Sequence, residues 1–256
     1  SSIIGNDFPL SFLEEMNSKG ISTEMIEIAK EKKSFFWKGE YKNDFNTRVT
    51  HDTQLNALEL YKPNLNKGLN DFRLVMLGNL EPGIQMEILS QVRNDDKFII
   101  LDTMNYWIDK TEKKLFEVIS KANLIVINDE ESKMLGKSDS LQKCAEYIMS
   151  CGPQYVIVKK GSEGAELFSK KQKSVIPAFT VKKVVDPTGA GDSFAGGICG
   201  YLSSRPKINF LEIHNSMIYG TVIASFCIQE FGVAGLQKLS AENVNERMLT
   251  FNEYLL

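Results

Sequence analysis

The stretch that decides the fold reads Val184-Val-Asp-Pro-Thr-Gly-Ala-Gly-Asp-Ser-Phe-Ala-Gly-Gly-Ile-Cys-Gly-Tyr201, in which a short apolar strand enters a glycine-bearing turn that opens a helix. Gly189 and Gly191 lack a Cβ, so consecutive backbone N–H groups can point into one hollow at the positive end of that helix. Such a hollow suits a phosphate. Asp192 stands at its mouth, where a carboxylate would repel a resting phosphate but could accept a proton from an attacking hydroxyl. The stretch therefore predicts phosphoryl transfer with Asp192 as the base.

Two other interpretations of this stretch stay open at the level of sequence. Asp192 could cap a helix that begins near Ser193, with glycines that only form a loop. A dinucleotide-binding turn would need a third glycine where the chain has Phe194, and it would normally belong to a first βα unit. The spacing therefore argues against a dinucleotide-binding turn, whereas the capping interpretation stays open.

The full string Asp186-Pro-Thr-Gly-Ala-Gly-Asp192-Ser-Phe-Ala-Gly-Gly197 resembles the C-terminal signature of the ribokinase-like, or PfkB, family of carbohydrate and nucleoside kinases. The resemblance implies an α/β fold with three α/β/α layers, a mostly parallel central sheet and a small β-sheet lid. It also implies ATP-dependent phosphorylation of a hydroxymethyl group on a sugar or nucleoside by direct in-line transfer. The family's base corresponds to Asp192, and the N–H groups of Gly189, Ala190 and Gly191 would hold the anion.

Composition bounds the class of protein. The chain has 256 residues, 43% of them apolar and 25% charged, which predicts one large α/β core with a small appendage. A net charge of −3 leaves no basic stripe, so we expect no nucleic-acid partner. The four cysteines form no Cys-x-x-Cys pair, and no apolar run reaches about 18 residues. We therefore expect a cytoplasmic protein with no membrane partner.

The beginning of the chain departs from the family pattern. Ser1-Ser-Ile-Ile-Gly reads as the end of a strand, and a helix is expected from about 9 to 19. Relatives usually carry a preceding first strand, a substrate-binding Asp and a Gly-Gly signature, which the given chain lacks. We expect either a truncated chain or the loss of that half of the sugar pocket. Residues 1–33 and 62–256 are then the core.

Residues 34–61 alternate aromatic and β-favouring side chains, which predicts two or three strands outside the core, with a turn at 43–46. These strands could be an edge meander that shields the core. The resemblance instead implies a lid over the substrate, with Asn46 and Arg48 as candidate substrate contacts. Because an isolated two-stranded ribbon is marginally stable, the lid needs bound substrate, a preceding strand or a second copy. We expect a homodimer through this region.

From residue 72 onward, apolar strands alternate with amphipathic helices. The pattern predicts strands at 72–78, 97–102, 124–128 and 155–159, and helices at 83–92, 111–121 and 138–150. Near-continuous apolar strands predict a parallel sheet covered on both faces, with ligands gathered beyond the strand C-termini. The polar clusters at these ends include Gly78-Asn79 and Asp102-Thr-Met-Asn105, so Asn79 and Asn105 are candidate substrate contacts.

Asn128-x-x-Glu131 follows one of these strands and opens a helix. The spacing alone predicts an N-cap with acidic residues in the first turn. The resemblance implies that Asn128 and Glu131 hold the Mg²⁺ and phosphate water network, with Glu131 binding the metal through water.

Lys159-Lys160-Gly161-Ser-Glu-Gly164 joins two predicted strands, which alone predicts a plain β-turn. The resemblance implies that Gly161 and Gly164 line the nucleotide pocket and that Lys159 or Lys160 meets a phosphate. Thr188 is a further candidate nucleotide contact.

Asp186 precedes the anion hole and could cap the turn through its side chain. The resemblance implies a monovalent cation there, K⁺, held with carbonyl groups from about 231 to 235.

The helix after the signature contains Gly196, Gly197 and Gly200, each of which costs about 1 kcal/mol relative to alanine. We expect close packing against a helix at about 210–230 to offset that cost. Two further function classes stay open: a binding-only relative that has lost part of the substrate site, and a purely structural scaffold. The carboxylate of Asp192 beside a phosphate hole argues against the first, and the second leaves the polar ends of four strands unexplained.

Overall fold

The structure of the chain is a computed structural model that describes residues 1–41, 48–65, 72–92 and 97–255. Its contacts divide the chain into two compact units. The first unit comprises Ser1–Asp71 and Gly83–Asn94, and the second comprises Phe72–Pro82 and Asp95–Leu256. The stretch expected to form the lid, 34–61, lies wholly inside the first unit.

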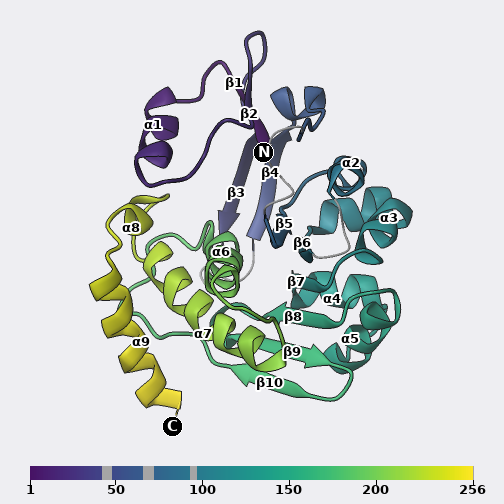
Figure 1. The fold of residues 1–256 in the computed structure, drawn as a ribbon, viewed down its shortest axis with the longest axis vertical. Coiled ribbons are helices and arrows are strands. Elements are labelled where there is room, and N and C mark those ends of the chain that lie inside the picture. The colour runs from purple at the N-terminus through teal and green to yellow at the C-terminus, as the bar shows by residue number, and fades with distance from the viewer. Residues whose placement is uncertain (42–47, 66–71, 93–96, 256) are drawn as a thin grey trace. The chain divides into compact units, whose positions relative to one another are not determined.

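The second unit is built on a central sheet in the order β10-β9-β8-β7-β6-β5 (Figure 1). Its strands are β5 (Leu74–Leu77), β6 (Phe98–Asp102), β7 (Leu124–Asn128), β8 (Tyr155–Lys159), β9 (Ala165–Ser169) and β10 (Lys173–Ile176). β5 to β8 run parallel, whereas β9 and β10 are antiparallel additions at one edge. Ile100, Leu124 and Val126 are fully buried in it. The predicted mostly parallel sheet is confirmed.

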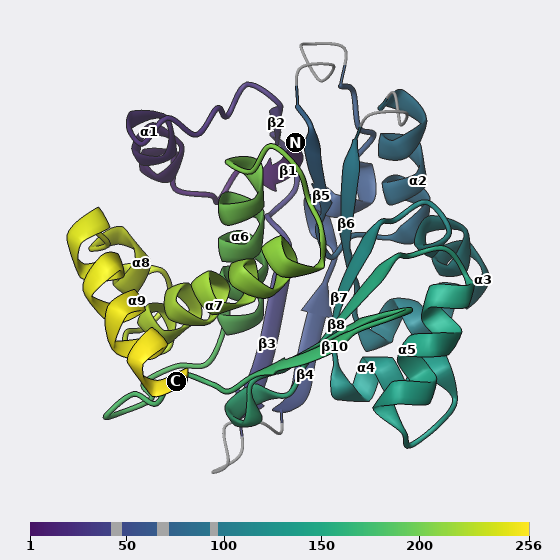
Figure 2. The same ribbon diagram turned by 60° about the horizontal axis from the view of Figure 1, so that its bottom comes forward.

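Helices cover both faces of this sheet (Figure 2). They are α3 (Asn105–Ile119), α4 (Asp129–Gly136), α5 (Leu141–Ser150), α6 (Ala190–Ser203), α7 (Phe210–Cys227), α8 (Ala234–Gln237) and α9 (Ala241–Leu255). α4 and α5 pack on β7, β8 and β9 from one side, and α3 lies against α4. α6 and α7 pack against each other and cover the other side, and α9 lies against α7. Apolar strands buried on both faces require this double cover.

Two helices of the second unit begin at residues other than those predicted. α3 begins at Asn105 rather than at 111, because Trp107 and Ile108 are buried and extend the packed face toward the strand end. The helix is interrupted at Thr111, whose hydroxyl bonds the Trp107 carbonyl at 3.1 Å. The helix predicted at 138–150 begins at Leu141, with Ser140 as its N-cap.

Two of the helix glycines allow α6 and α7 to approach closely. A Cβ added at Gly197 would lie 2.7 Å from Gly220 Cα, and one added at Gly220 would lie 2.6 Å from the Phe194 carbonyl oxygen. The expected close packing is confirmed at these positions. At Gly196 and Gly200, however, an added Cβ would meet no atom within 4 Å, so the same explanation is wrong there.

The first unit contains two small sheets. Its elements are β1 (Ser2–Gly5), α1 (Leu10–Ser18), β2 (Ile26–Ala29), β3 (Phe36–Tyr41), β4 (Arg48–Gln54), the 3-10 helix Asn56–Leu60, and α2 (Pro82–Gln91), apart from Pro82. β1 pairs in parallel with β2, and β3 pairs antiparallel with β4, with a shift in register between Lys38 and Gly39. The indole of Trp37 lies over Gly39, where an added Cβ would clash with the ring. The two strands expected within 34–61 are therefore present.

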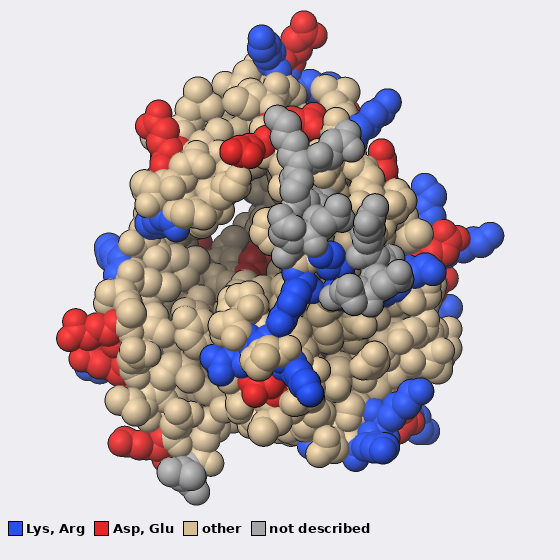
Figure 3. All heavy atoms as spheres, in the orientation of Figure 1, with Lys and Arg blue, Asp and Glu red and all other residues tan. Residues whose placement is uncertain are grey.

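The charged side chains and the cysteines are arranged as the composition predicts. The face shown in Figure 3 carries both Lys and Arg and Asp and Glu side chains rather than one sign alone. All four cysteines, which lie in the described part of the chain, are free thiols. Within the same residues, no helix is both long and apolar enough to cross a membrane.

Candidate active site

The turn before α6 is set by one glycine. Gly189 has φ +81°, a left-handed backbone conformation that a side chain would disfavour, and it is the N-cap of α6. The helix therefore begins at Ala190, earlier than the start near Ser193 considered above. Because the N-cap is Gly189 with no side-chain cap, Asp192 does not cap this helix, and the capping interpretation is wrong.

Three backbone N–H groups at this turn have no acceptor among the described residues. The Ala190 N–H donates to the Pro187 carbonyl at 3.1 Å, whereas the N–H groups of Gly189, Gly191 and Asp192 make no hydrogen bond to any described residue. They lie at the positive end of α6, where the aligned peptide dipoles favour a negative charge. The turn can therefore hold an anion with the N–H groups of Gly189, Gly191 and Asp192, whereas that of Ala190 is already paired.

The end of α7 and the turn's own side chains hold this turn in place. The N–H groups of Val185 and Asp186 donate to the Ile228 carbonyl at 2.8 and 3.3 Å. Asp186 Oδ1 accepts the Thr188 N–H at 2.9 Å, which is the predicted side-chain cap of the turn. Residues 181–187 form no strand, so the apolar strand expected before the turn is wrong. The residues that were to form it bond to a helix end instead.

Asp192 lies in the first turn of α6 and is exposed. Its carboxylate makes no hydrogen bond or ion pair with any described residue. A carboxylate in the first turn of a helix is stabilised in its charged form by the helix dipole. Asp192 is therefore a solvent-accessible carboxylate beside the unpaired N–H groups.

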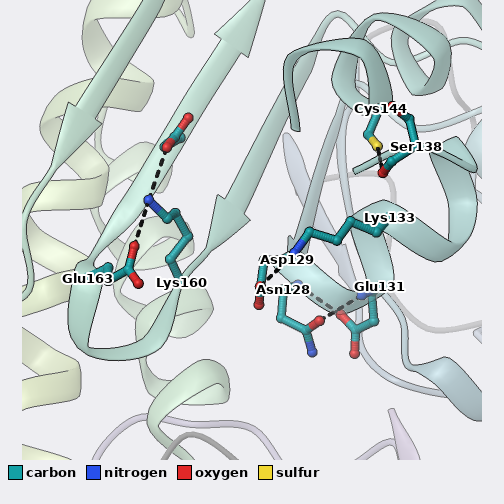
Figure 4. Close-up of polar contacts among 9 residues, drawn as sticks. Asn128, Asp129, Glu131, Lys133, Ser138, Cys144, Lys160 and Glu163 are labelled. Carbon is teal, nitrogen blue, oxygen red and sulfur yellow. Dashed lines mark hydrogen bonds and ion pairs between the residues drawn. The ribbon is translucent and has the colours of Figure 1, made fainter. Parts of the chain in front are cut away.

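The structure separates the two candidate lysines. Lys159 ends β8, and its Nζ lies 3.5 Å from Asp102 Oδ1. A Cβ added at Gly191 would be 3.3 Å from the same Nζ, so this ammonium sits beside the anion hole. Lys160 instead bonds Glu163 at 3.0 Å and Glu166 at 3.2 Å (Figure 4). Of the two, only Lys159 is placed next to the turn.

The loop after β8 is a tight turn, as the sequence alone predicted. The Lys160 N–H donates to the Gly164 carbonyl at 2.8 Å, and the Gly164 N–H donates to the Gly161 carbonyl at 3.1 Å. Gly161 and Gly164 both have positive φ, +56° and +92°. A Cβ at Gly164 would lie 2.0 Å from the Ile176 carbonyl oxygen, so packing alone already requires a glycine there.

Asn128 and Glu131 form the capping box at the start of α4 (Figure 4). Asn128 Oδ1 accepts the Glu131 N–H at 2.8 Å, and Glu131 Oε2 accepts the Asn128 N–H at 2.9 Å. Glu131 is only 3% exposed, which is unusual for a residue that merely caps a helix. Asn128 pairs with Lys159 in the sheet register, so both residues lie at the same edge as the anion hole.

The four candidate substrate contacts have different surroundings. Asn79 Oδ1 accepts the Trp107 indole N–H at 2.9 Å, and its Nδ2 lies 3.1 Å from Met104 Sδ. Asn105 Oδ1 accepts the Tyr106 N–H at 2.9 Å. Arg48 opens β4 in the first unit, and Asn46 lies outside the described residues. Asn79 and Asn105 thus follow neighbouring strands and make local hydrogen bonds.

Comparison with known proteins decides the family. A family model described as pfkB family carbohydrate kinase matches residues 1–239. The chain belongs to the pfkB family. The cytidine kinase of Thermococcus kodakarensis is 25% identical over 142 residues, which cover 53% of this chain and 50% of that protein. The nucleoside kinase of Methanocaldococcus jannaschii is 31% identical over 122 residues, which cover 48% of this chain and 38% of that protein.

This pfkB-family chain thus spans half or less of the length of these curated relatives. Among solved structures, Burkholderia thailandensis nucleoside kinase in complex with inosine matches it with a TM-score of 0.77 at 19% identity, covering 98% of this chain and 80% of that one. A likeness at this identity shows the fold, and the predicted ribokinase-like fold is confirmed.

The pfkB family implies Mg²⁺, and the donors present fit a metal held through water. In the described part of the chain, no three His, Cys, Asp or Glu side chains are grouped to bind a metal directly. Asn128 and the buried Glu131 nevertheless supply hard oxygen atoms at the strand end next to that of Lys159. Mg²⁺ keeps much of its hydration and needs few direct protein ligands, so this sparse donor set suits it.

Asp102 lies at the same strand ends, and no role was predicted for it from the sequence. Asp102 ends β6 and is 6% exposed. Burial raises the pKa of its carboxyl, while the Lys159 ammonium lowers it and the negative charge of Asp192 raises it further. The sequence signal that could have identified Asp102 was a carboxylate at the end of an otherwise apolar strand. Such a carboxylate is rarely buried without a partner, so it indicates a nearby positive charge.

Proposed function

We propose that the chain transfers a phosphoryl group from ATP to a hydroxymethyl group of a sugar or nucleoside by direct in-line attack. The observation that carries this proposal is the exposed, unpaired carboxylate of Asp192 beside the unpaired N–H groups of Gly189, Gly191 and Asp192 itself. A base next to fixed donors is the arrangement that a phosphoryl transfer to a hydroxyl requires.

Each group has one role in this proposal. Asp192 accepts the proton of the attacking hydroxyl, while the N–H groups of the turn hold the negative charge that develops on the phosphoryl oxygens. Lys159 adds a positive charge at the same turn. Asn128 and Glu131 would hold hydrated Mg²⁺, which neutralises charge on the phosphate oxygens when bound.

Other residues are proposed to contact the nucleotide and the acceptor. Gly161, Gly164 and Thr188 would line the nucleotide pocket, where two positive-φ glycines let the backbone approach a ligand closely. Asn46, Arg48, Asn79 and Asn105 would contact the acceptor. The names of the two relatives, cytidine kinase and nucleoside kinase, support a nucleoside acceptor, and the description of the family as carbohydrate kinases supports a sugar.

A panel of acceptors tests the proposal. The chain is incubated with ATP and Mg²⁺ and with ribose, fructose, a purine nucleoside, a pyrimidine nucleoside or a polyol, and ADP release is followed. We expect one acceptor class to raise ADP release well above the rate with water alone. No acceptor-dependent release, from a chain that melts cooperatively and binds ATP, would contradict the kinase proposal.

Potassium is expected to raise the rate of phosphoryl transfer. The carboxylate of Asp186 lies in the turn, and a cation bound there would add positive charge next to the anion hole and stiffen the turn. Carbonyl groups from about 231 to 235 would supply the further oxygen atoms. Rates are compared at equal ionic strength in potassium, sodium and tetramethylammonium chloride. Identical rates in all three salts would rule out the cation site.

We also expect the chain to form a homodimer through β3 and β4. Phe36 and Val49 are 46% and 42% exposed, so this two-stranded sheet leaves large apolar side chains in water. Such a ribbon gains stability by pairing with a second copy, and symmetric pairing is the commonest arrangement among soluble oligomers.

Two neighbouring substitutions locate the interface. Phe36 and Trp37 are consecutive in β3, so they point to opposite faces of the sheet. Sedimentation velocity is measured on the wild type, Phe36→Asp and Trp37→Asp. We expect the wild type to be a dimer. The variant whose aspartate lies on the face that contacts the second copy should be a monomer. A wild type that stays monomeric at high micromolar concentration would refute the dimer, and dimers in both variants would move the interface elsewhere.

A further inference from the structure

Asp102 and Lys159 form an ion pair that bridges two strands which are not neighbours. Asp102 ends β6 and Lys159 ends β8, and β7 lies between them. Neighbouring strands are about 4.8 Å apart, so the two backbones are separated by about 10 Å. Only a long, extended side chain spans that gap. The Lys159 stem therefore crosses the end of β7 to reach the carboxylate.

The pair holds the ammonium next to the anion hole. The side chain of Asp102 is 8% exposed and that of Lys159 is 20% exposed, so both charges are largely removed from water. Among the described residues, Asp102 is the one hydrogen-bond or ion-pair partner of the Lys159 ammonium, at 3.5 Å. The position of a Cβ on Gly191 is 3.3 Å from that ammonium. One side of the ammonium thus faces a carboxylate and another faces the turn.

A second carboxylate competes for the same lysine. Burial and the negative charge of Asp192 both raise the pKa of the Asp102 carboxyl, so Asp192 lies within electrostatic range of it. Lysine has a flexible four-carbon stem and no preferred fork geometry. Without Asp102, the negative charge of Asp192 would attract the ammonium, whereas the proposed reaction needs Asp192 unpaired.

We propose that Asp102 is a positioning residue that acts through Lys159, holding its ammonium beside Gly191 so that it meets the phosphates of a bound nucleotide and stays away from Asp192. The inference rests on the proposed function, because it assigns the residue that orients a cation of the same site. The 3.5 Å separation is longer than a tight charge-assisted hydrogen bond, so the ammonium can shift toward a phosphate without first breaking a short contact.

An ion pair with a purely structural role makes a different prediction. Lys160 is the internal comparison, because its side chain is 23% exposed and that of Lys159 is 20% exposed. The acidic partners of Lys160 are Glu163 and Glu166. Loss of a structural pair changes stability but does not distinguish a nucleotide from a nucleoside. Loss of a positioning pair weakens binding only when phosphates are present.

A double-mutant cycle on ATP binding separates these cases. The variants are Asp102→Asn, Lys159→Met and the double variant, each of which keeps side-chain size while removing charge, with Asp102→Ser as a second neutral variant. Lys160→Met is the matched control. Dissociation constants for ATP with Mg²⁺, and for adenosine, are measured by calorimetry, and circular dichroism melting confirms that each variant is folded.

We expect Asp102→Asn and Lys159→Met each to weaken ATP binding about tenfold, as for the loss of one charge-assisted phosphate contact. In the Lys159→Met background, Asp102→Asn should change the ATP dissociation constant by less than about twofold, because its effect passes through the lysine. Adenosine binding to every variant, and ATP binding to Lys160→Met, should stay at wild-type values.

Three results would overturn the inference. They are an unchanged or tighter ATP dissociation constant in folded Asp102→Asn, effects of the two substitutions that multiply, and a wild type with no affinity for ATP. Phosphoryl transfer is measured separately on the same proteins. If the cycle holds but no acceptor is phosphorylated, the positioning role stands and the kinase proposal fails. If an acceptor is phosphorylated but the two substitutions act independently on ATP binding, the kinase proposal stands and the positioning role fails.

Discussion

Replacing Asp192 with asparagine is expected to slow phosphoryl transfer by about 100-fold or more while ATP binding survives, because a positioned base contributes about that factor. Asparagine keeps the size of the side chain but cannot accept the proton of the attacking hydroxyl. The N–H groups of Gly189 and Gly191 are untouched, so the anion hole remains. Removing a negative charge from the mouth of the hole should leave ATP binding equal or tighter.

The measurement pairs single-turnover rates with calorimetric ATP affinity. Glu242→Gln is the matched control, because Glu242 is also an exposed acid in the first turn of a helix, α9, and its loss tests for a general effect of helix charge. We expect the control to match the wild type in both measurements. Turnover of Asp192→Asn close to the wild-type rate would exclude Asp192 as the base.

Replacing Gly197 with alanine is expected to lower the free energy of unfolding by about 1–3 kcal/mol, the usual cost of overpacking a well-packed contact. The new Cβ would lie 2.7 Å from Gly220 Cα and 3.3 Å from Gly220 N. Backbone atoms cannot rotate away as a side chain can, so α6 and α7 must move apart. That movement also shifts Gly189, because the anion hole is the N-terminal end of α6.

Gly200→Ala provides the control within the same helix. An added Cβ at Gly200 meets no atom within 4 Å, so the substitution should raise the free energy of unfolding by up to about 1 kcal/mol through helix propensity and a less flexible unfolded chain. Urea unfolding followed by circular dichroism measures both variants. Equal effects of the two substitutions, in either direction, would contradict the close approach of the helices at Gly197.

Features encoded by local spacing could be predicted from the sequence. Apolar runs such as 124–128 and 155–159 form the buried parallel strands as expected, because continuous apolar strands must be covered on both faces. Asn128 and Glu131, three residues apart, form the predicted cap. The glycine turn before α6 also formed where it was expected, since few residues other than glycine tolerate φ +81°.

Predictions failed where distant contacts compete with local preference. Val184 and Val185 have the composition of a strand, but they form none, and the Val185 N–H bonds the Ile228 carbonyl at the end of α7. The first turn of α3 was missed because the buried Trp107 and Ile108, rather than a capping residue, determine where it starts. Local propensity is a weak term, and tertiary burial overrides it at such positions.

The sequence by itself determined the chemistry of the candidate site: a turn able to hold an anion, a carboxylate beside it, and lysines at a strand end. The tertiary structure alone decided which lysine faces the turn and which acid orients it. Lys159 and Lys160 are adjacent and chemically identical, yet one reaches Asp102 and the other reaches Glu163 and Glu166. Lys159 ends β8 and Lys160 lies just beyond it, in the turn that contains Glu163. The order of the strands brings Asp102 near Lys159, so this pairing is not encoded in local spacing.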